Sequence, residues 1–365
     1  MKHNMFNFIK SFIGANSYLG IDIGTTSIKL VEISKGRLQP KLLNYGILET
    51  YGHLERLNDA IQTSFLKLAE RQTAELLKLL LKKIKIKTTD TIASIPAFSA
   101  FITILEIPEM PEADTAKAVP FQIRQHIPLP TSEVAIEWLK VGKKEDEKGF
   151  VKQEILVISV PNEQIKRYQN VFKFAGLKLK ALEIESLALI RSLIANDPTP
   201  TLIVDIGARS TNIVVTENGF LKYNSQTDFA GGSLTQAISN GLNISIRRAE
   251  ELKKQRGLLA GEGEYELSTL TIPFLDAIIS EVKRARDNYE KNQKYKIERV
   301  ILAGGGANLL GLDKYFERQI NLPTVIGNSF SKIEYPAKIE PFVKELGPSF
   351  SVAIGLGIRE FSNFV

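Results

Sequence analysis

The chain has 365 residues, 44% of them hydrophobic and 24% charged, which suits a globular protein with two domains and substantial cores. It contains no cysteine and three scattered histidines, so disulfides, zinc–thiolate centres and thiol nucleophiles are excluded and a histidine metal site is not indicated. The formal charge of +6 is mild, no nucleic-acid motif is present, and no apolar run reaches the ~18 residues that a membrane span needs.

Residues 1–17 form a leader ahead of the first predicted strand. The segment is rich in Phe and Ile but lacks a signal-peptide cleavage pattern. Two interpretations remain open. The leader is either a frayed cap on the first strand or a short amphipathic helix that contacts a membrane or a partner.

Residues 18–38 have the pattern of a β-hairpin, in which two apolar runs flank a short turn of glycine and hydroxyl side chains. Such a turn exposes backbone N–H groups and hydroxyls, which suits a phosphate group. Asp22 ends the first run, where its carboxylate can face a phosphate-bound Mg²⁺. A turn without any ligand is the simpler alternative. The turn residues are Gly24, Thr25, Thr26 and Ser27.

Residues 202–221 repeat this hairpin at a constant offset and without a gap. Two matching hairpins predict two related halves, each of which presents one phosphate loop to a shared cleft. The matched positions that carry the pattern are Asp22 and Asp205, Gly24 and Gly207, and Ser27 and Ser210.

The rest of the pattern predicts an α/β chain. A compact module is expected over 88–180, with a charged and mobile tip at 142–149, and a bridging helix at 183–195 follows it. Residues 323–348 are expected to be rich in loops. The other strands and helices are predicted at 44–51, 57–85, 90–96, 100–107, 111–126, 134–141, 154–160, 162–175, 234–240, 246–255, 270–292, 297–303, 311–320 and 349–361.

Five pieces occur in order: a phosphate hairpin, a bridging helix, a second phosphate hairpin, a strand ending in a glycine turn, and a last helix with small residues. Over residues 18–361 this order resembles the actin-like ATPase superfamily, in which the pieces are phosphate 1, connect 1, phosphate 2, adenosine and connect 2. The resemblance implies an α/β, actin-like ATPase fold. Two duplicated lobes would surround a nucleotide cleft, with an inserted α+β subdomain in the first lobe.

Three segments resemble the PilM family of type IV pilus assembly, in the FtsA/PilM branch of that superfamily. They read EIPEMPEADTAKAVPFQIRQHIPLPTSEVAIEWLKV, VFKFAGLKLKALEIESLALIRSL and ILAGGGANLLGL. The resemblance implies a cytoplasmic protein that is peripheral to the inner membrane, serves twitching motility and binds the cytoplasmic N-terminal peptide of PilN. Through PilN it would connect to PilO and the pilus platform, and the resemblance also allows a homo-oligomer.

The same resemblance divides the chain into eight parts. They are a leader (1–17), the first lobe core (18–88), the inserted subdomain (89–180), the bridging helix (181–200), the second lobe core (201–240), a helical subdomain of the second lobe (241–296), more of the second lobe core (297–347) and a C-terminal helix that returns to the first lobe (348–365).

The resemblance also implies ATP and Mg²⁺ as ligands. Asp22 and Asp205 would hold Mg²⁺, mostly through water. Glu185, at the start of the bridging helix, would orient the attacking water, although an acid that stabilises a helix N-terminus is the alternative. No strong general base is evident, so hydrolysis is expected to be slow at most. The second loop and the helix after it would add phosphate contacts from Gly207, Arg209, Ser210, Thr211 and Gly232.

The nucleoside would lie beside two further groups. Glu250 and Lys253, three residues apart on one helix, would hold the ribose and adenine, with a surface ion pair as the alternative. Gly304, Gly305 and Gly306 carry no side chains, so the backbone there could approach adenosine closely. Other classes stay open: an FtsA-like division protein, a type II secretion component, a sugar kinase, or a filament-forming scaffold.

Overall fold

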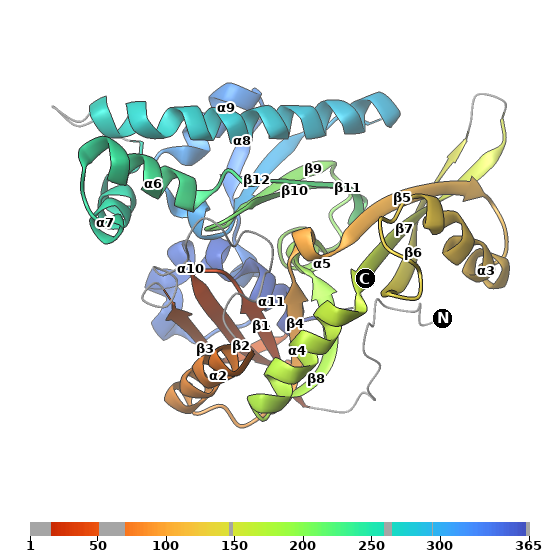
Figure 1. Ribbon diagram of the computed structural model, residues 1–365, viewed down its shortest axis with the longest axis horizontal. Helices are drawn as coiled ribbons and strands as arrows, with labels where there is room; N and C mark the ends of the chain where they lie inside the picture. The colour runs from red at the N-terminus through yellow and green to blue at the C-terminus, as the bar shows by residue number, and fades with distance from the viewer. Residues whose placement is uncertain (1–15, 51–69, 146–148, 259–264, 294, 363–365) are drawn as a thin grey trace.

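The computed structural model describes residues 16–50, 70–145, 149–258, 265–293 and 295–362. Figure 1 shows two lobes, each with its own sheet, and a third, smaller sheet that projects from them. Most of the predicted leader and the first part of the helix predicted at 57–85 lie outside the described residues.

The two large sheets share one topology, which confirms the predicted duplication. The strand order is β3-β2-β1-β4-β8 in the first lobe and β11-β10-β9-β12-β13 in the second. In each sheet a central strand pairs antiparallel with its hairpin partner and parallel with the strand on its other side. The strands are β1 Ser17–Ile23, β2 Ser27–Ser34, β3 Lys41–Glu49, β4 Asp90–Ile95, β8 Lys178–Ile184, β9 Thr201–Ile206, β10 Thr211–Glu217, β11 Phe220–Thr227, β12 Arg299–Ala303 and β13 Thr324–Ile326.

Helices cover the faces of both sheets, so the central strands are buried on both sides and read as nearly continuous apolar runs. In the first lobe α2 packs on α4, and in the second α8 packs on α6 and on the hairpin β10–β11. The helices are α2 Glu70–Ile84, α4 Asn162–Phe174, α5 Glu185–Leu193, α6 Gly231–Leu242, α7 Ile246–Arg256, α8 Tyr265–Asn292, α9 Leu312–Ile320, α10 Val343–Ser349 and α11 Ser351–Gly357.

The two linking helices, α5 and α11, cross in close contact where the lobes meet. Gly355 lies so near the backbone of Ala188 that no side chain would fit there. A buried ion cluster joins the same elements. Arg191 of α5 donates to Glu183 at 2.7 Å and to the Gly355 carbonyl at 3.0 Å, and Arg359 lies 2.9 Å from Glu183. These contacts fix the crossing of the two helices.

The inserted unit has a separate three-stranded sheet, which lies inside the predicted range 89–180. The sheet has the order β5-β7-β6, with β5 Phe101–Pro108, β6 Val134–Glu145 and β7 Val151–Pro161, and α3 Glu112–Gln122 lies on one face. The flanking strands β4 and β8 belong to the first-lobe sheet, and α4 packs in that lobe. The strands of the separate sheet therefore fall within 101–161. Local patterning could not predict these limits, because it does not reveal which sheet a strand joins.

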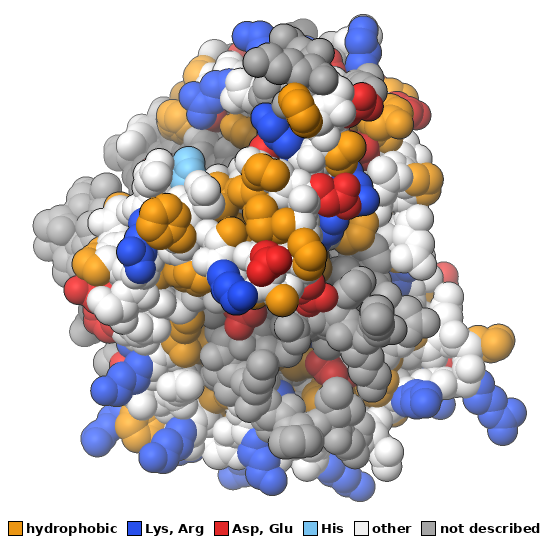
Figure 2. Space-filling model, turned by 90° about the vertical axis from the view of Figure 1, so that its right-hand side faces the viewer, with side chains coloured by type: hydrophobic (Ala, Val, Ile, Leu, Met, Phe, Trp, Pro, Cys, Tyr) orange, Lys and Arg blue, Asp and Glu red, His pale blue; other side chains and the backbone are white. Residues whose placement is uncertain are grey.

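The hairpin of this unit is longer than predicted. Residues 142–145, which were expected to form part of a mobile tip, continue β6 and pair with β7. Ion pairs accompany the charged extension, since Lys144 lies 3.0 Å from Glu106 of β5 and Lys143 pairs with Glu109, just after that strand. Figure 2 looks onto the side of the molecule from which this unit projects and shows apolar side chains gathered among charged ones.

The chain returns to the first lobe earlier than the predicted boundary at residue 348. Phe330, Ile339 and Val343 share a buried cluster with Val31 and Leu42 of the first sheet. The short helices η4 Ser329–Lys332 and η5 Ala337–Phe342 lie in this stretch, which was predicted to be loop-rich, and the last helix is shorter than the predicted 349–361. None of the described helices is long and apolar enough to cross a membrane.

Candidate functional site

The two predicted phosphate loops have the same backbone geometry. In the first, the N–H of Gly24 donates to the carbonyl of Ser27 at 2.9 Å, and in the second the N–H of Gly207 donates to that of Ser210 at 3.0 Å. Each turn follows the end of a central strand, β1 or β9, that finishes with an aspartate and one further residue. The structure therefore confirms that the loops are equivalent, as the sequence repeat predicts.

Hydrogen bonds from Thr50, the residue after β3, hold the first loop. Thr50, which is buried, donates its backbone N–H to the carbonyl of Thr26 at 2.8 Å and its hydroxyl to that of Thr25 at 3.4 Å. In a trans peptide the N–H points opposite to the carbonyl. The N–H groups of Thr26 and Ser27 consequently face away from Thr50, on the side where an anion can approach.

The N-terminus of α6 holds the second loop by two successive carbonyls that lie one position earlier in the repeat. The N–H of Gly231 donates to Gly207 at 3.0 Å, and that of Gly232 donates to Ala208 at 2.8 Å. Gly232, which was predicted to contact the nucleotide, thus supports the loop, and an added Cβ would lie 2.6 Å from the Ala208 carbonyl. Thr211 does not fit its predicted role, because its side chain is fully buried and donates to the Phe229 carbonyl at 2.7 Å.

Three carboxyl groups gather where the lobes meet. Asp22 and Asp205 lie near the ends of β1 and β9, and Glu185 lies in the first turn of α5. Burial raises the pKa of Glu185 well above its usual value, and the charges of Asp22 and Asp205 add to the shift. Burial also raises the pKa of Asp205 to about 6, opposed by Lys29 and reinforced by Asp22. The negative charges of these groups therefore repel one another. A bound cation would reduce this repulsion, which is typical of a functional site.

Lys29 also belongs to this site. Its side chain is only 15% exposed, and its Nζ lies 3.5 Å from Oδ2 of Asp22, whose Oδ1 accepts a bond of 2.9 Å from Ser94. The hairpin register pairs Asp22 directly with Lys29. That pairing was available in the sequence, because a turn at 24–27 fixes which residues of the two strands face each other.

Side chains of the second lobe contact α5 next to Glu185. Ser186 donates to Asn224 at 3.1 Å, Asn224 donates to Asn212 at 2.6 Å, and Asn212 donates to Ser186 at 3.0 Å. The closed ring joins α5 to the strands β10 and β11. Sequence reasoning missed these residues, since nothing in their local pattern shows that they meet.

The glycine turn after β12 lies against the second loop. Gly304 has φ +78°, and a Cβ there would lie 2.5 Å from Oδ1 of Asp205. A Cβ on Gly306 would collide with Ile206, whereas one on Gly305 would meet no atom within 4 Å. The structure thus places the predicted adenosine turn beside the carboxylates and leaves open space only next to its middle residue.

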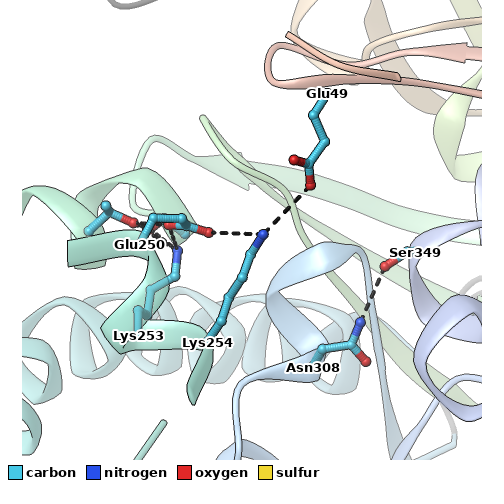
Figure 3. Close-up of polar contacts among 8 residues, drawn as sticks. Glu49, Glu250, Lys253, Lys254, Asn308 and Ser349 are labelled. Atoms are coloured by element: carbon cyan, nitrogen blue, oxygen red, sulfur yellow. Dashed lines mark hydrogen bonds and ion pairs between the residues drawn. The ribbon is translucent and has the colours of Figure 1, made fainter. Parts of the chain in front are cut away.

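Glu250 and Lys253 connect α7 to the second loop rather than pairing on a free surface (Figure 3). Lys253 lies 2.6 Å from Glu250 and donates to Thr235 at 2.8 Å and to the Gly231 carbonyl at 2.9 Å. Burial lowers the pKa of Lys253, which Glu250 opposes. Lys254 of the same helix lies 3.7 Å from Glu49 of the first lobe, so an ion pair crosses between the lobes.

Hydrogen bonds to α10 hold the glycine turn. Figure 3 shows Asn308, just after the turn, donating to Ser349 at 3.3 Å, and its amide also reaches the Glu345 carbonyl at 2.9 Å. The N–H of Gly304 donates to the Pro348 carbonyl at 2.9 Å. Both ends of the turn are therefore anchored to α10.

Arg209 lies on the second loop, as predicted, but faces an aromatic ring of the other lobe. Its Cζ lies 5.6 Å from the centroid of Phe98, which belongs to the short helix η1 Ala97–Ser99 after β4. The contact is a cation–π interaction that joins the second loop to the first lobe. This contact was not predicted.

The donor set fits a phosphate-bound Mg²⁺ and not a cage made by protein alone. Among the described residues no group of three or more His, Cys, Asp or Glu could hold a metal ion. Mg²⁺ in nucleotide sites takes one or two carboxylates together with water and phosphate oxygens. Asp22 and Asp205 supply that number of carboxylates.

Two duplicated lobes with mirrored loops at their junction define an actin-like protein, and the solved structures agree with this class. The chain resembles MreB5 of Spiroplasma citri bound to AMPPNP, with a TM-score of 0.54 and 15% identity, covering 96% of this chain and 97% of that one. A PilM–PilN type IV pilus biogenesis complex gives a TM-score of 0.79 and 21% identity, with 94% and 98% covered.

The sequence comparison is more specific than the fold. The family described as type IV pilus assembly protein PilM matches residues 20–361, so the chain belongs to the PilM family. A more distant relative is the cell division protein FtsA of Enterococcus hirae, which is 23% identical over 81% of this chain and 74% of its own length.

Proposed function

We propose that this protein binds ATP·Mg²⁺ between its lobes and that the nucleotide sets how the lobes close. The observation that carries the proposal is the pair of loops, in each of which hydrogen bonds hold two successive carbonyls on one side, so that the following N–H groups point to the other. Backbone N–H groups arranged in this way bind phosphate oxygens.

The neighbouring residues have separate roles in this proposal. Asp22 and Asp205 hold Mg²⁺, which when bound neutralises charge on the phosphates, and Lys29 adds a cation beside Asp22. Glu185 stands where it can orient a water, and its raised pKa favours the protonated form. A protonated acid is a poor base, which agrees with hydrolysis that is slow at most.

Nucleoside recognition falls to the second lobe. Adenosine occupies the open space beside Gly305, because a Cβ on Gly305 would meet no atom within 4 Å, whereas Gly304 and Gly306 leave no room for a side chain. Lys253 and Glu250 support the second phosphate loop indirectly. Lys253 donates to the Gly231 carbonyl, and the N–H of Gly231 donates to Gly207 of the loop.

We further propose the cytoplasmic N-terminal peptide of PilN as the partner, bound at the inserted unit. One protein of similar fold was solved as a PilM–PilN complex. On this unit Phe121 is 64% exposed, and Met110, Ile127, Ile136 and Trp138 pack only partly against its core. Apolar side chains that a fold leaves partly uncovered form a site that a peptide can cover. Through PilN the protein would join PilO and the pilus platform at the inner membrane.

The nucleotide proposal is tested by calorimetry of ATP with and without Mg²⁺. Asp22→Ala and Asp205→Ala should remove Mg²⁺-dependent binding, while Asp287→Ala, an exposed aspartate of α8, should bind as the wild type does. Unchanged affinity in both site variants would refute the site.

The partner proposal is tested with a synthetic peptide that has the N-terminal sequence of PilN from the same organism. Phe121→Asp should weaken its binding at least tenfold, because a charge replaces an exposed apolar contact. Phe342→Asp, at a comparably exposed phenylalanine of the first lobe, serves as the control. No binding of the peptide to the wild type would remove the partner assignment and leave the nucleotide site unaffected.

A further inference from the structure

The short helix η1, residues 97–99, is the connection through which the chain passes from the first-lobe sheet to the inserted unit. It follows β4 directly, and β5 of the inserted sheet begins at Phe101, two residues after its end. Any displacement of η1 is therefore passed along the chain to β5.

This segment contacts the interlobe site twice. The ring of Phe98 lies under the Arg209 guanidinium of the second phosphate loop, 5.6 Å from Cζ to the ring centroid. The backbone of Ala97 makes a hydrogen bond with the carboxyl group of Glu185. The short helix η1 thus contacts both Arg209 of the second phosphate loop and Glu185, the first residue of α5.

The inserted unit is also held to the second lobe at a separate place. Glu154 of β7 pairs with Lys222 of β11, and the two side chains are 3% and 5% exposed. Gln293, just after α8, donates to the other oxygen of Glu154 at 2.9 Å. Since the unit is covalently part of the first lobe and packs on the second, a change in lobe closure must act on it.

We propose that Phe98 is a positioning residue that couples phosphate binding at Arg209 to the inserted unit. A guanidinium can stack its face on a ring while its edge holds a phosphate in a bidentate manner. Bound phosphate then fixes Arg209, the ring and η1 together, and β5 starts from a fixed point. A second ligand on the inserted unit has less to order, so ATP and the peptide each tighten the other.

The size of the effect follows from the contact. Cation–π pairs at partly exposed positions change an equilibrium by about twofold to about fivefold. The peptide affinity of the wild type should therefore rise by about that factor when ATP·Mg²⁺ is present, and the ATP affinity should rise by the same factor when peptide is present.

The test uses Phe98→Leu, which keeps an apolar side chain but removes the ring face. Calorimetry should give ATP and peptide affinities within about twofold of the wild type when each is measured alone, and a coupling factor close to one. Phe98→Tyr restores the ring and should restore the coupling. Phe174→Leu is the matched control, because Arg71 lies over that ring at 5.8 Å on α2 and α4, away from the interlobe site.

A second readout needs no partner. Trp138 is the single tryptophan of the chain and lies on β6 of the inserted unit. ATP·Mg²⁺ should change its emission in the wild type and in Phe174→Leu, and should not change it in Phe98→Leu.

The inference rests on the function proposed above, and the outcomes separate the two. If the wild type binds no ATP or no peptide, the proposed function fails and the inference fails with it. If the wild type binds both without positive coupling, or if Phe98→Leu retains the full coupling, only the inference is overturned.

Discussion

The glycine turn offers a substitution that separates ligand binding from folding. A Cβ on Gly305 would meet no atom within 4 Å, and its φ is not in the left-handed region, so Gly305→Val should fold normally. The valine side chain would occupy the open space proposed for adenosine. Loss of contact with the whole nucleoside should lower ATP affinity at least ~100-fold, equivalent to about 2.7 kcal/mol.

Gly304→Ala provides the contrast. Its φ of +78° and ψ of 173° are nearly restricted to glycine, and the new Cβ would lie 2.5 Å from Oδ1 of Asp205. The backbone conformation alone should cost about 1–3 kcal/mol of unfolding free energy. Urea denaturation and calorimetry of ATP on both variants check the pair. If Gly305→Val binds ATP like the wild type, adenosine does not lie at this turn. If it unfolds as readily as Gly304→Ala, the reading of the open space is wrong.

Three further predictions concern charged groups. Protons compete with Mg²⁺ for Asp205, whose pKa is about 6, so Mg²⁺-dependent ATP affinity should fall about tenfold per pH unit below that value and level off above it. The Asp205→Asn variant should lose both the affinity and this pH dependence. Calorimetry from pH 5 to 8 measures both. Lys29→Met should move the midpoint of this profile to higher pH, because Lys29 lowers the pKa of Asp205; an unmoved midpoint would contradict the assignment. Glu183→Gln should destabilise the fold by about 3–5 kcal/mol in urea denaturation, because Arg191 and Arg359 lose their buried counter-charge.

The loops of this fold were predictable because their signal is local. A strand that ends in Asp-x-Gly before hydroxyl residues specifies the turn, and its repetition at a fixed spacing specifies two lobes. The structure confirms both the duplication and the equivalent turns. Thr211 was the exception, because it occupies the first position of β10, where its hydroxyl is used to hold the Phe229 carbonyl.

Tertiary pairing was not predictable in the same way. The strand β4 reads like the strands after it, yet it joins β1 and β8, while β5 joins a separate sheet. Phe98 and Arg209 lie in different lobes, and no local pattern of either residue shows that they meet. Such contacts depend on how the two lobes pack, which a periodicity cannot show.

The duplication also shows how two equivalent positions have acquired different roles. Lys29 and Asn212 occupy the same place in the two hairpins, each directly opposite the aspartate that ends the central strand. Lys29 places a cation beside Asp22, whereas Asn212 donates to Ser186 at the start of the linking helix. A second lysine at Asn212 would put a cation next to Asp205 and break the ring of hydrogen bonds that holds α5. At this position the first lobe therefore supplies a cation to the interlobe site, whereas the second lobe supplies a contact that fixes the helix carrying Glu185.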